Sequence, residues 1–478
     1  MAHKKIPIAV AHGDGIGPEI MEAVLHVMKA ADAPLEIHEV QVGEKVYLSG
    51  EKTGMAKEMW DVIRKCDAFL KAPITTPQGG GFKSLNVTIR TTLGLYANVR
   101  PCVAYQPYVR TKHPGMDVVI IRENEEDLYA GIEYRQTPSV YQALKLISTQ
   151  GCEKIIRYAF EYAKANRRKK VTCFSKDNIL KLTDGHFHKV FDRIAKEYPE
   201  LENEHWIIDI GAAKLADTPE AFDVIVMANL YGDILSDVGA QIAGSVGLAG
   251  SANIGEHGAM FEAIHGSAPR RAGQNMANPS GLLLAAVQML AHIGLPDHAT
   301  AVHNAWLKTI EDGVHTYDIF KEGVSKEKVG TREFAEAIAK NLGKKPSTLK
   351  SARYSAPSKE LFSRSEEGEA HVKTELKGVD VYVRHKGPVD QLAEKLKVIE
   401  EGALELAMIL NRGVKVWPDT MPETSCVDQW RCRFMGKKGL KHSDIAALLS
   451  RLSVANIDFL QIQNLNDFDG EPGYSVTR

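Results

Sequence analysis

Residues 6–31 read "IPIAVAHGDGIGPEIMEAVLHVMKAA", and this stretch decides how the chain begins to fold. An apolar run leads into glycines at positions 13, 15 and 17, and Pro18 then opens a segment with helical spacing. Proline suits a first helical turn because its missing N–H would have no partner there. The pattern therefore predicts a strand, a tight turn and a helix, but it leaves open whether the turn binds a dinucleotide.

The dinucleotide-binding fingerprint is G-x-G-x-x-G, with an acidic residue about 20 positions further on. Counting from Gly13, the third glycine position is occupied by Pro18, while Glu36 and Glu39 lie near the acidic position. The match is partial, and an isolated turn of this kind is more often structural. The rest of the chain has to decide between the two interpretations.

The composition is that of an ordinary globular protein. The chain has 478 residues, of which 44% are hydrophobic and 25% charged, enough for about three domains of about 150 residues. Its 59 basic and 61 acidic residues give a net charge of −2, so no basic excess indicates a nucleic-acid partner. Six cysteines in so long a chain argue against a disulfide framework, and the absence of a C-x-x-C motif argues against a zinc site.

Neither a signal peptide nor a membrane span is expected. The apolar run after the basic N-terminus is too short for a signal sequence. The most apolar helical stretch, residues 280–295, carries Gln288 and His292 and is shorter than the roughly 20 residues that cross a bilayer. We expect a soluble cytoplasmic protein in a reducing compartment, without a membrane or nucleic-acid partner.

Short apolar runs alternate with longer amphipathic patterns up to about Leu342, which predicts an α/β fold. The expected helices lie at residues 149–166 and 184–200. The expected strands lie at residues 66–73, 117–124, 170–178, 205–211 and 223–230.

Residues 344–369 are rich in Ser, Pro, Lys and Glu and predict a linker. A further alternating pattern follows and predicts a separate small α/β domain over residues 370–478. Its expected helices are residues 388–413 and 441–457. Its expected strands are residues 378–385, 414–418, 428–436 and 458–465.

Asp233 and Asp237 lie four residues apart in "NLYGDILSDVGAQIAG". On a helix this spacing puts both carboxylates on one face. Two such charges repel unless a cation lies between them, and Mg²⁺ and Mn²⁺ prefer oxygen ligands. A solvated helix face is the commoner fate of such a pair, but the flanking segments are apolar. We therefore predict a metal site here.

Ser84, Asn86, Arg90, Arg100 and Arg122 fall within two neighbouring stretches, 84–101 and 118–124. Arginine binds carboxylates through two parallel hydrogen bonds, so a cluster suits a substrate with several carboxylates. Scattered surface arginines are the alternative. Arg122 argues against that alternative because it ends an apolar strand.

Two weaker signals complete the set. The loop "FEAIHGSAPRRAGQNMANPSG" carries His265, Arg270 and Arg271, which could hold a nucleotide, although an ordinary loop would look similar. Tyr129 and Lys176 are residue types that act as general acid or base when their pKa values are tuned. Either residue alone would more often be structural or exposed.

Taken together, these stretches resemble one family, the metal-dependent decarboxylating β-hydroxyacid dehydrogenases that act on isocitrate, 3-isopropylmalate, homoisocitrate or tartrate. The resemblance covers roughly residues 5–342 and implies an α/β fold that is not a Rossmann fold. It also places the cofactor along "HGSAP", so the glycine turn would lie near the cofactor without binding its pyrophosphate. The matching motifs, in family order, are "GDGIGPE", "KAPITTPQGGG", "SLNVTIR", "YANVRP", "IRENEEDLYAGIE", "NLYGDILSD" and "FEAIHGSAPRRAGQNMANP".

Within that family, Ser84 and Asn86 resemble the pair that faces the γ-carboxylate of isocitrate, whereas isopropylmalate enzymes are apolar there. The additional C-terminal domain resembles that of the longer bacterial isocitrate dehydrogenases. The resemblance implies oxidative decarboxylation of isocitrate to 2-oxoglutarate with NADP and Mg²⁺ or Mn²⁺. An isopropylmalate or homoisocitrate dehydrogenase, or a non-catalytic regulatory subunit, stays open as an alternative.

The resemblance also implies residue roles. Tyr129 would protonate the enolate, and Lys176 of the other subunit would help to take the hydroxyl proton. The substrate carboxylates would be bound by Arg90, Arg100 and Arg122, next to Ser84, Asn86 and Thr76. The metal would be held by Asp233 and Asp237, with Asp209 from the partner subunit. Lys71, Thr75 and Thr76 would lie between substrate and nicotinamide.

For the cofactor, basic residues after "HGSAP" are typical of NADP-dependent relatives, which meet the 2′-phosphate with cations. The expected cofactor residues along and beyond this loop are His265, Gly266, Ser267, Ala268, Arg270, Arg271, Asn278, Tyr317 and Lys321.

A site completed by two chains requires at least a homodimer. The resemblance implies a large domain of residues 1–95 and 245–343 and a small domain of residues 96–244 with a dimer clasp. The linker at 344–369 and the accessory domain at 370–478 would follow.

Overall fold

The computed structural model describes residues 5–75, 84–355, 372–400, 402–419, 423–437 and 439–476. The chain forms two compact units. The large unit comprises Met1–Ala130 and Leu146–Ser363, and the small unit comprises Gly131–Lys145 and Arg364–Arg478. None of the described helices is both long and apolar enough to cross a membrane.

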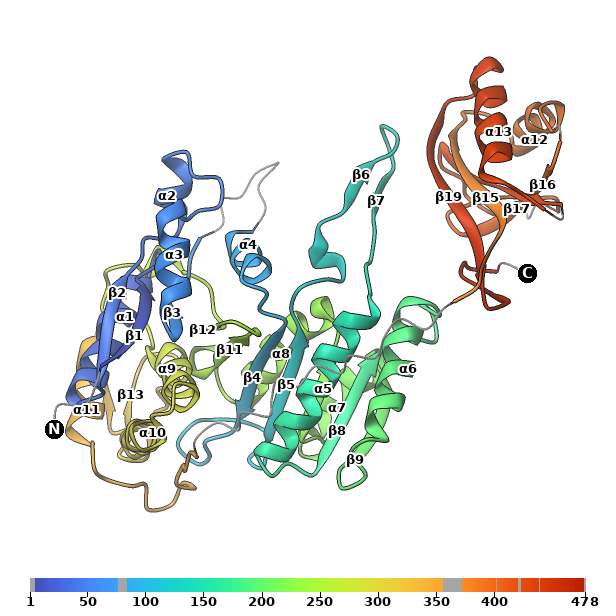
Figure 1. Cartoon of the computed structure of the whole chain (residues 1–478). Coiled ribbons are helices and arrows are strands. Elements are labelled where there is room, and N and C mark those ends of the chain that lie inside the picture. Colours follow the sequence, from blue (N-terminus) through green and yellow to red (C-terminus); the bar gives the residue numbers. More distant parts are fainter. Residues whose placement is uncertain are drawn as a thin grey trace. The chain divides into compact units, whose positions relative to one another are not determined.

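A ten-stranded sheet runs through the large unit in the order β2-β1-β3-β12-β11-β4-β5-β10-β8-β9 (Figure 1). The strands at its two ends are parallel, while β12, β11, β4 and β5 pair antiparallel in the middle. This mixed order is not that of a Rossmann sheet. The strand bounds are β1 Ile6–Ala11, β2 Leu35–Glu39, β3 Ala68–Lys71, β4 Ala97–Val103, β5 Asp117–Glu123, β8 Lys170–Ser175, β9 Glu202–Ile207, β10 Val224–Met227, β11 Gly250–Ile254 and β12 Ala259–Ala263.

Helices cover the sheet, and short elements join them. The α-helices are α1 Gly17–Ala30, α2 Glu44–Leu48, α3 Lys57–Lys65, α4 Leu85–Thr92, α5 Thr149–Ala165, α6 Thr183–Ala195, α7 Ile208–Asp217, α8 Asn229–Ala243, α9 Ser280–His292, α10 Pro296–Glu311 and α11 Thr331–Lys340. The short elements are the 3-10 turns Leu128–Ala130, Pro219–Ala221, Val246–Leu248 and Pro269–Arg271, and the paired strands β13 Val314–His315 and β14 Glu327–Lys328.

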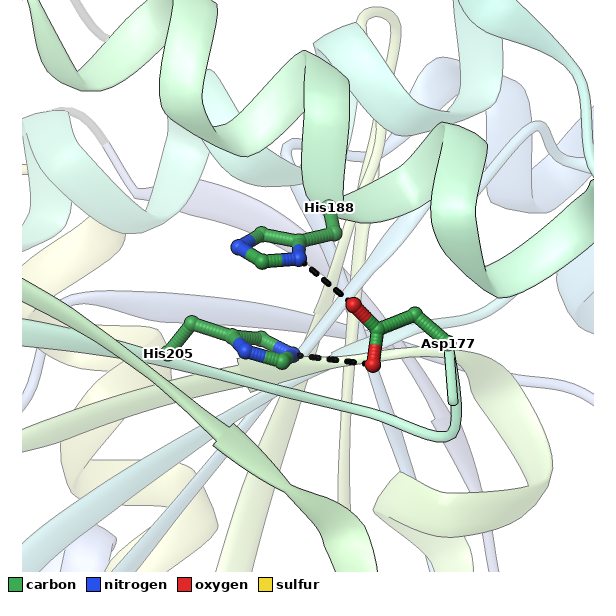
Figure 2. A group of neighbouring side chains, drawn as sticks. All are labelled: Asp177, His188 and His205. Carbon is green, nitrogen blue, oxygen red and sulfur yellow. Dashed lines mark hydrogen bonds and ion pairs between the residues drawn. The ribbon is translucent and has the colours of Figure 1, made fainter. Parts of the chain in front are cut away.

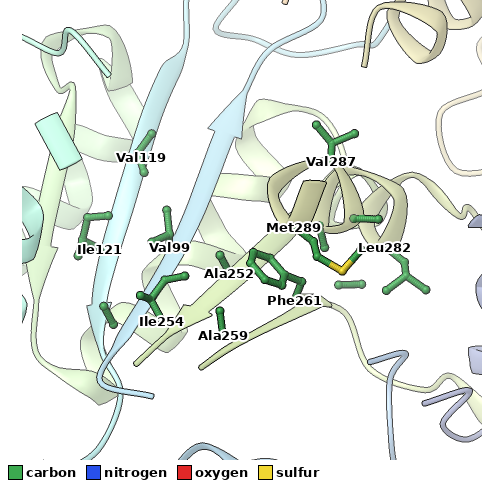
Figure 3. Packing of buried hydrophobic residues seen from close by; sticks show 14 of the residues in the cluster. Val99, Val119, Ile121, Ala252, Ile254, Ala259, Phe261, Leu282, Val287 and Met289 are labelled. Atoms are coloured by element: carbon green, nitrogen blue, oxygen red, sulfur yellow. The ribbon is translucent and has the colours of Figure 1, made fainter. Parts of the chain in front are cut away.

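Apolar runs become strands buried on both faces, as parallel sheets covered by helices require. Every residue of β3, β10, β11 and β12 is buried. Figure 3 shows Met289 of α9 close to Phe261 of β12, and both belong to one continuous core that also contains Leu282 and Val287. The α9 stretch is therefore a core helix, which explains its high apolar content.

The glycine turn joins β1 to α1 and packs tightly against two loops. Gly13 and Gly15 have φ of 68° and 60°, a region that only glycine enters at little cost. A Cβ on Gly13 would lie 2.2 Å from the Pro73 oxygen, and one on Gly15 would lie 2.0 Å from the Ser267 oxygen. The turn is thus held against the loop that contains "HGSAP", as the family resemblance implies.

The small unit contains a second sheet in the order β17-β16-β18-β15-β19-β20, whose neighbouring strands are antiparallel. Its own apolar core lies between this sheet and two helices. The helices are α12 Val389–Val398 and α13 His442–Val454. The strands are β15 Thr374–Arg384, β16 Leu404–Asn411, β17 Val414–Trp417, β18 Gln429–Gly436, β19 Phe459–Phe468 and β20 Glu471–Pro472.

The helix predicted over residues 388–413 is wrong in its second half. α12 ends at Val398, and residues 404–411 form β16. Leu404 and Leu406 are buried and Glu405 is exposed, which is the two-residue period of a strand. The segment "LELAMILN" is rich in good helix formers, but pairing with β18 overrides that local preference.

Two segments pack against parts of the chain that local sequence patterns do not indicate. The hairpin β6 Glu133–Arg135 and β7 Tyr141–Ala143 belongs to the small unit, where Thr137 and Ser139 donate to Asp428 at 2.7 and 2.6 Å. Residues 347–354, the strap, are tied to α10 in the large unit. The first part of the predicted linker is therefore packed structure, and residues 356–369 of it lie outside the described residues.

Candidate active site

The centre of the site forms where β5 ends beside α8. Arg122, at the end of β5, is 1% exposed and donates to Asn229 Oδ1 from Nε and Nη2 at 3.0 and 2.7 Å. Its Nη1 donates to Asp233. A Cβ on Gly232 would lie 2.5 Å from Arg122 Cγ, so the glycine permits this close approach. The structure thus brings Arg122 of the predicted arginine set to Asp233 of the predicted metal site, through Gly232 and Asn229, which sequence reasoning missed.

Arg100 on β4 forms ion pairs with both Asp233 and Asp237. Its Nη2 lies 3.5 Å from Asp233 Oδ1, and its Nη1 lies 3.4 Å from Asp237 Oδ1. Further bonds from Nη1 to Ser236 and from Nε to Asn98, both 2.6 Å, fix the guanidinium plane. Arg100 and Arg122 therefore place two buried cations against the carboxylate face of α8.

Tyr129 lies on the same carboxylate. Its hydroxyl donates to Asp233 Oδ2 at 2.6 Å, and Arg122 Cζ lies 4.8 Å from its ring centroid. Burial and then the hydrogen bond to Asp233 raise the pKa of Tyr129. The phenol is therefore held protonated, which is the state a proton donor needs.

The two aspartates differ electrostatically. Burial raises the pKa of Asp233, but the charges of Arg122 and Arg100 outweigh it, so the net shift is downward. Burial raises the pKa of Asp237, and the neighbouring Asp233 charge adds to that rise against Arg100. A cation between the two would favour the ionised form of both.

Glu262 on β12 organises a second buried group. Its carboxylate lies 2.6 Å from Lys71 Nζ and accepts from Arg90 Nη2 at 2.8 Å and from Asn253 at 3.0 Å. Burial raises the pKa of Glu262, but Lys71 and Arg90 outweigh it and lower the pKa overall. Sequence reasoning missed Glu262. The signal for it was an acid placed inside the apolar strand "AMFEA".

The α4 helix presents the predicted specificity residues. Ser84 precedes its first residue, and Asn86 and Arg90 follow four residues apart. Among the described residues, the buried Asn86 Oδ1 and Arg90 Nε have no hydrogen-bond partner. Buried polar atoms without partners are costly, so this face of α4 suits a polar ligand. Thr76, also predicted here, lies outside the described residues.

A cavity of about 470 Å³ adjoins the "HGSAP" loop. Several residues predicted to bind the cofactor lie in its wall. Among them, Arg271 Cζ lies 4.8 Å from the Tyr317 ring centroid. Thr75 and Ser267 join across the turn by a 2.6 Å hydrogen bond between their hydroxyls, while Arg270 and Lys321 are exposed. Six of the residues predicted to bind the cofactor line this cavity, namely His265, Gly266, Ala268, Arg271, Asn278 and Tyr317.

Asp318 also lines this cavity, and sequence reasoning missed it. Its carboxylate accepts from Ser245 at 2.8 Å, Thr316 at 2.6 Å and Asn278 at 3.0 Å. Three donors on one carboxylate hold the cavity wall in place. No local motif marks this role, because the donors come from three separate segments.

Lys176 and Asp209 form a pair of their own. Lys176 Nζ donates to Asp209 Oδ1 at 2.7 Å, and the Asp209 side chain is 69% exposed. The hydrogen bond from Lys176 lowers the pKa of Asp209. Within the described residues of one chain, no bond or ion pair links this pair to Asp233 or Asp237, so its predicted catalytic role stays a prediction.

Comparisons with known proteins agree over the whole chain. The family model for isocitrate/isopropylmalate dehydrogenase matches residues 7–338, and that for the bacterial isocitrate dehydrogenase C-terminal domain matches residues 374–478. A Rickettsia bellii protein named isocitrate dehydrogenase (NADP) is 58% identical over 99% of both chains.

Solved structures give the same result. A protein from Thermus thermophilus has a TM-score of 0.90 and 43% identity, covering 98% of this chain and 95% of its own. An isocitrate dehydrogenase from Methylococcus capsulatus has a TM-score of 0.67 and 41% identity, covering 70% of this chain and 99% of its own. This chain belongs to the isocitrate/isopropylmalate dehydrogenase family.

Proposed function

We propose that this protein catalyses the NADP-dependent oxidative decarboxylation of isocitrate to 2-oxoglutarate. The observation that carries the proposal is the cluster in which the buried Arg100 and Arg122, together with Tyr129, converge on the partly exposed Asp233 and Asp237. Full-length relatives at 55% to 58% identity carry the name isocitrate dehydrogenase (NADP). The complete cluster argues against a non-catalytic subunit.

The charge balance of the site fits a tricarboxylate. Four cations, Lys71, Arg90, Arg100 and Arg122, face three carboxylates, Asp233, Asp237 and Glu262, which leaves one net positive charge. A divalent cation and a substrate with three ionised carboxylates bring the sum to zero. A dicarboxylate such as isopropylmalate leaves a positive charge buried, which is unfavourable.

The α4 face separates the two substrates by the same logic. The unpartnered Arg90 Nε is a donor that suits a carboxylate, whereas the unpartnered Asn86 Oδ1 is an acceptor that suits a hydroxyl or an N–H group. An isopropyl group there would leave Arg90 Nε buried without a hydrogen bond, at a cost of about 1–3 kcal/mol. Isopropylmalate dehydrogenase is therefore the less favoured function.

The donor set at Asp233 and Asp237 fits a hard divalent ion such as Mg²⁺ or Mn²⁺. Both ligands are carboxylates on one helix face, which is the oxygen-only donor set that such ions prefer. When bound, such an ion supplies Lewis-acid stabilisation of negative charge on the substrate oxygen. Asp209 would complete the ligands from a second chain.

The chain's own groups then have separate tasks. Arg90, Arg100 and Arg122 hold the carboxylates so that the C2 hydrogen faces the nicotinamide. Lys176 takes part in removing the hydroxyl proton as hydride leaves C2, and CO₂ is lost from the resulting β-keto acid. Tyr129, protonated and 2.6 Å from Asp233, returns a proton to C3. Each task uses a group already oriented by packing or hydrogen bonds.

We propose a homodimer, which is supported by the absence of a bond between the Lys176–Asp209 pair and Asp233 or Asp237 within the described residues of one chain. The surface around Asp209 is apolar: Ile210 on α7 is 47% exposed, and Ile234 and Val238 on α8 are 53% and 39% exposed. A second copy of this chain on these helices would bury the three side chains. It would also carry its Lys176 and Asp209 toward the α8 carboxylates. A site built from two chains makes dimerisation a requirement for activity.

NADP as the cofactor is supported by charge at the "HGSAP" cavity. Arg271 lines it against Tyr317, and the exposed Arg270 and Lys321 make no ion pair among the described residues. Free cations suit a 2′-phosphate, whereas sites for NAD offer an acid to the ribose.

The test is a matrix of substrates and cofactors on purified, metal-loaded protein. We expect the highest kcat/KM with isocitrate and NADP, loss of turnover with EDTA, and recovery with Mg²⁺ or Mn²⁺. Arg270→Asp should lower kcat/KM for NADP far more than for NAD, while the exposed control Glu327→Gln should change neither. A higher kcat/KM with 3-isopropylmalate than with isocitrate would overturn the proposal.

A further inference from the structure

Three side chains outside the site described above meet at the end of β8 (Figure 2). Asp177 follows β8, His188 lies on α6 and His205 lies on β9. One ligand atom from each lies within 4.8 Å of the other two. A carboxylate and two imidazoles from three neighbouring elements therefore share one small space.

The two imidazole rings are stacked, with centroids 3.6 Å apart and planes at 17°. His188 Nδ1 lies 2.8 Å from Asp177 Oδ2, and His205 Nε2 lies 3.9 Å from Asp177 Oδ1. One ring nitrogen of each histidine thus faces the same carboxylate (Figure 2). Ser175 adds a hydroxyl oxygen 2.8 Å from His205 Nε2.

We propose that Asp177, His188 and His205 form a second metal site that binds Zn²⁺ or a similar transition-metal ion. Two imidazole nitrogens and one carboxylate oxygen suit Zn²⁺, Co²⁺ and Ni²⁺, while Mg²⁺ prefers ligands that are all oxygen. Three protein ligands and one water give the four-coordinate geometry that zinc adopts. The site differs in ligand chemistry from the Asp233 and Asp237 pair.

The protonation states suit metal binding. Burial, and then the charge of His188, lower the pKa of His205, which keeps its imidazole neutral. Burial raises the pKa of Asp177, but the interactions led by the hydrogen bond from His188 lower it overall, so the carboxylate is ionised. Neutral imidazole and ionised carboxylate are the ligand forms.

Access is also available. The side chains of Asp177, His188 and His205 are 23%, 25% and 16% exposed, so an ion can enter. Binding requires the nearly parallel rings to tilt until their nitrogens converge on the ion. The bound ion would tie the end of β8 to α6 and β9, directly beside Lys176. No cysteine takes part, so the cysteine pattern gave no sign of this site.

The test uses full-length protein freed of metal and then saturated with Mg²⁺, which occupies sites made only of oxygen ligands. Co²⁺ is titrated in, and its visible absorption reports nitrogen ligands in four-coordinate geometry. We expect one such Co²⁺ per chain, displaced by Zn²⁺, and a higher melting temperature with Zn²⁺ present. These readouts do not depend on catalytic turnover.

His188→Gln and His205→Gln should weaken Co²⁺ and Zn²⁺ binding by at least about tenfold. His186→Gln is the matched control on α6, because His186 Nε2 faces Thr149 Oγ1 at 3.0 Å, and it should bind as the wild type does. Asp177→Asn preserves the side-chain shape and gives a second variant if a histidine change prevents folding. The proposal is overturned if the folded variants bind Co²⁺ like the wild type, or if the wild type shows no nitrogen-ligated Co²⁺.

Discussion

Glu262 is the residue on which the buried charges around Lys71 and Arg90 depend. Its two oxygens are divided between the two cations, at 2.6 and 2.8 Å, and all three side chains are buried. Removing one partner of a buried ion pair leaves an uncompensated charge, which is strongly destabilising. Glu262 therefore serves both the fold and the orientation of Arg90.

Glu262→Gln should lower the free energy of unfolding by about 3–5 kcal/mol at neutral pH, measured by urea denaturation. Because the folded-state pKa of Glu262 is lowered, its stabilisation is present above the unfolded-state pKa and is lost as the pH falls toward the folded value. The difference between wild type and variant should therefore shrink in acid. An equal difference at pH 7 and pH 3 would contradict this interpretation, and Glu327→Gln should show none.

Glu123 is buried at the end of β5. Its pKa is raised, whereas the pKa of Glu262 is lowered. Burial raises it to about 8, although the N–H groups of Glu125 and Glu126 oppose the rise. With the folded-state pKa above the unfolded value, stability is complete at low pH. It is lost as the pH rises toward about 8.

Glu123→Gln should remove this loss. Between about pH 5 and pH 8, the difference in the free energy of unfolding, variant minus wild type, should increase by up to about 1.4 kcal/mol per pH unit. Urea titrations at four pH values measure the difference. A difference that stays constant with pH would show that Glu123 is ionised in the folded protein.

At the scale of elements, the strap of residues 347–354 is held on α10 by hydrogen bonds to its side chains. Glu311 at the end of α10 accepts backbone N–H groups from Ser347, Thr348 and Leu349 at 2.8 to 3.4 Å. Asn304 exchanges two hydrogen bonds, both 2.9 Å, with the backbone of Ala352. These bonds take the place of a regular element and keep the strap on the core.

Glu311→Ala should release the first half of the strap. Losing a hydrogen bond to a charged group costs about 1.5–3 kcal/mol, so the amides of Ser347–Leu349 should exchange with deuterium at least about tenfold faster. Hydrogen-exchange mass spectrometry measures this change directly. Glu336→Ala, on the exposed face of α11, is the control, and similar exchange in both variants would show that Glu311 does not hold the strap.

At the scale of the whole molecule, the small unit has an apolar core of its own. Its cluster of buried residues contains no residue of the large unit. The hairpin of β6 and β7 leaves the large unit to join the small one through Asp428. The small unit is therefore built from two distant stretches of sequence.

The shared site proposed above predicts complementation between subunits. Tyr129→Phe and Lys176→Met chains should each be nearly inactive as homodimers. After mixing and subunit exchange, activity should rise, because one site of a mixed dimer receives an intact Tyr129 and an intact partner Lys176. Mass spectrometry confirms the exchange. No gain in activity from a confirmed mixture would show that each chain builds its own site.

Local patterns were sufficient for much of the fold. The apolar runs at residues 66–73, 117–124, 170–178 and 223–230 became β3, β5, β8 and β10, because buried strands of a covered sheet need continuous apolar sequence. The strand expected at 205–211 ends at Ile207, where α7 begins. Boundaries of this kind depend on neighbouring elements.

The sequence by itself determined that Asp233 and Asp237 share one helix face, because the helical repeat sets that spacing. It also indicated the family, the arginines and the "HGSAP" loop, whose binding of the nucleotide stays a prediction. Only the tertiary structure decided that Glu262 joins Lys71 to Arg90, that residues 404–411 pair as a strand, and that Asp177 meets two histidines. These contacts join residues far apart in the chain, so their energies depend on packing that no local pattern encodes.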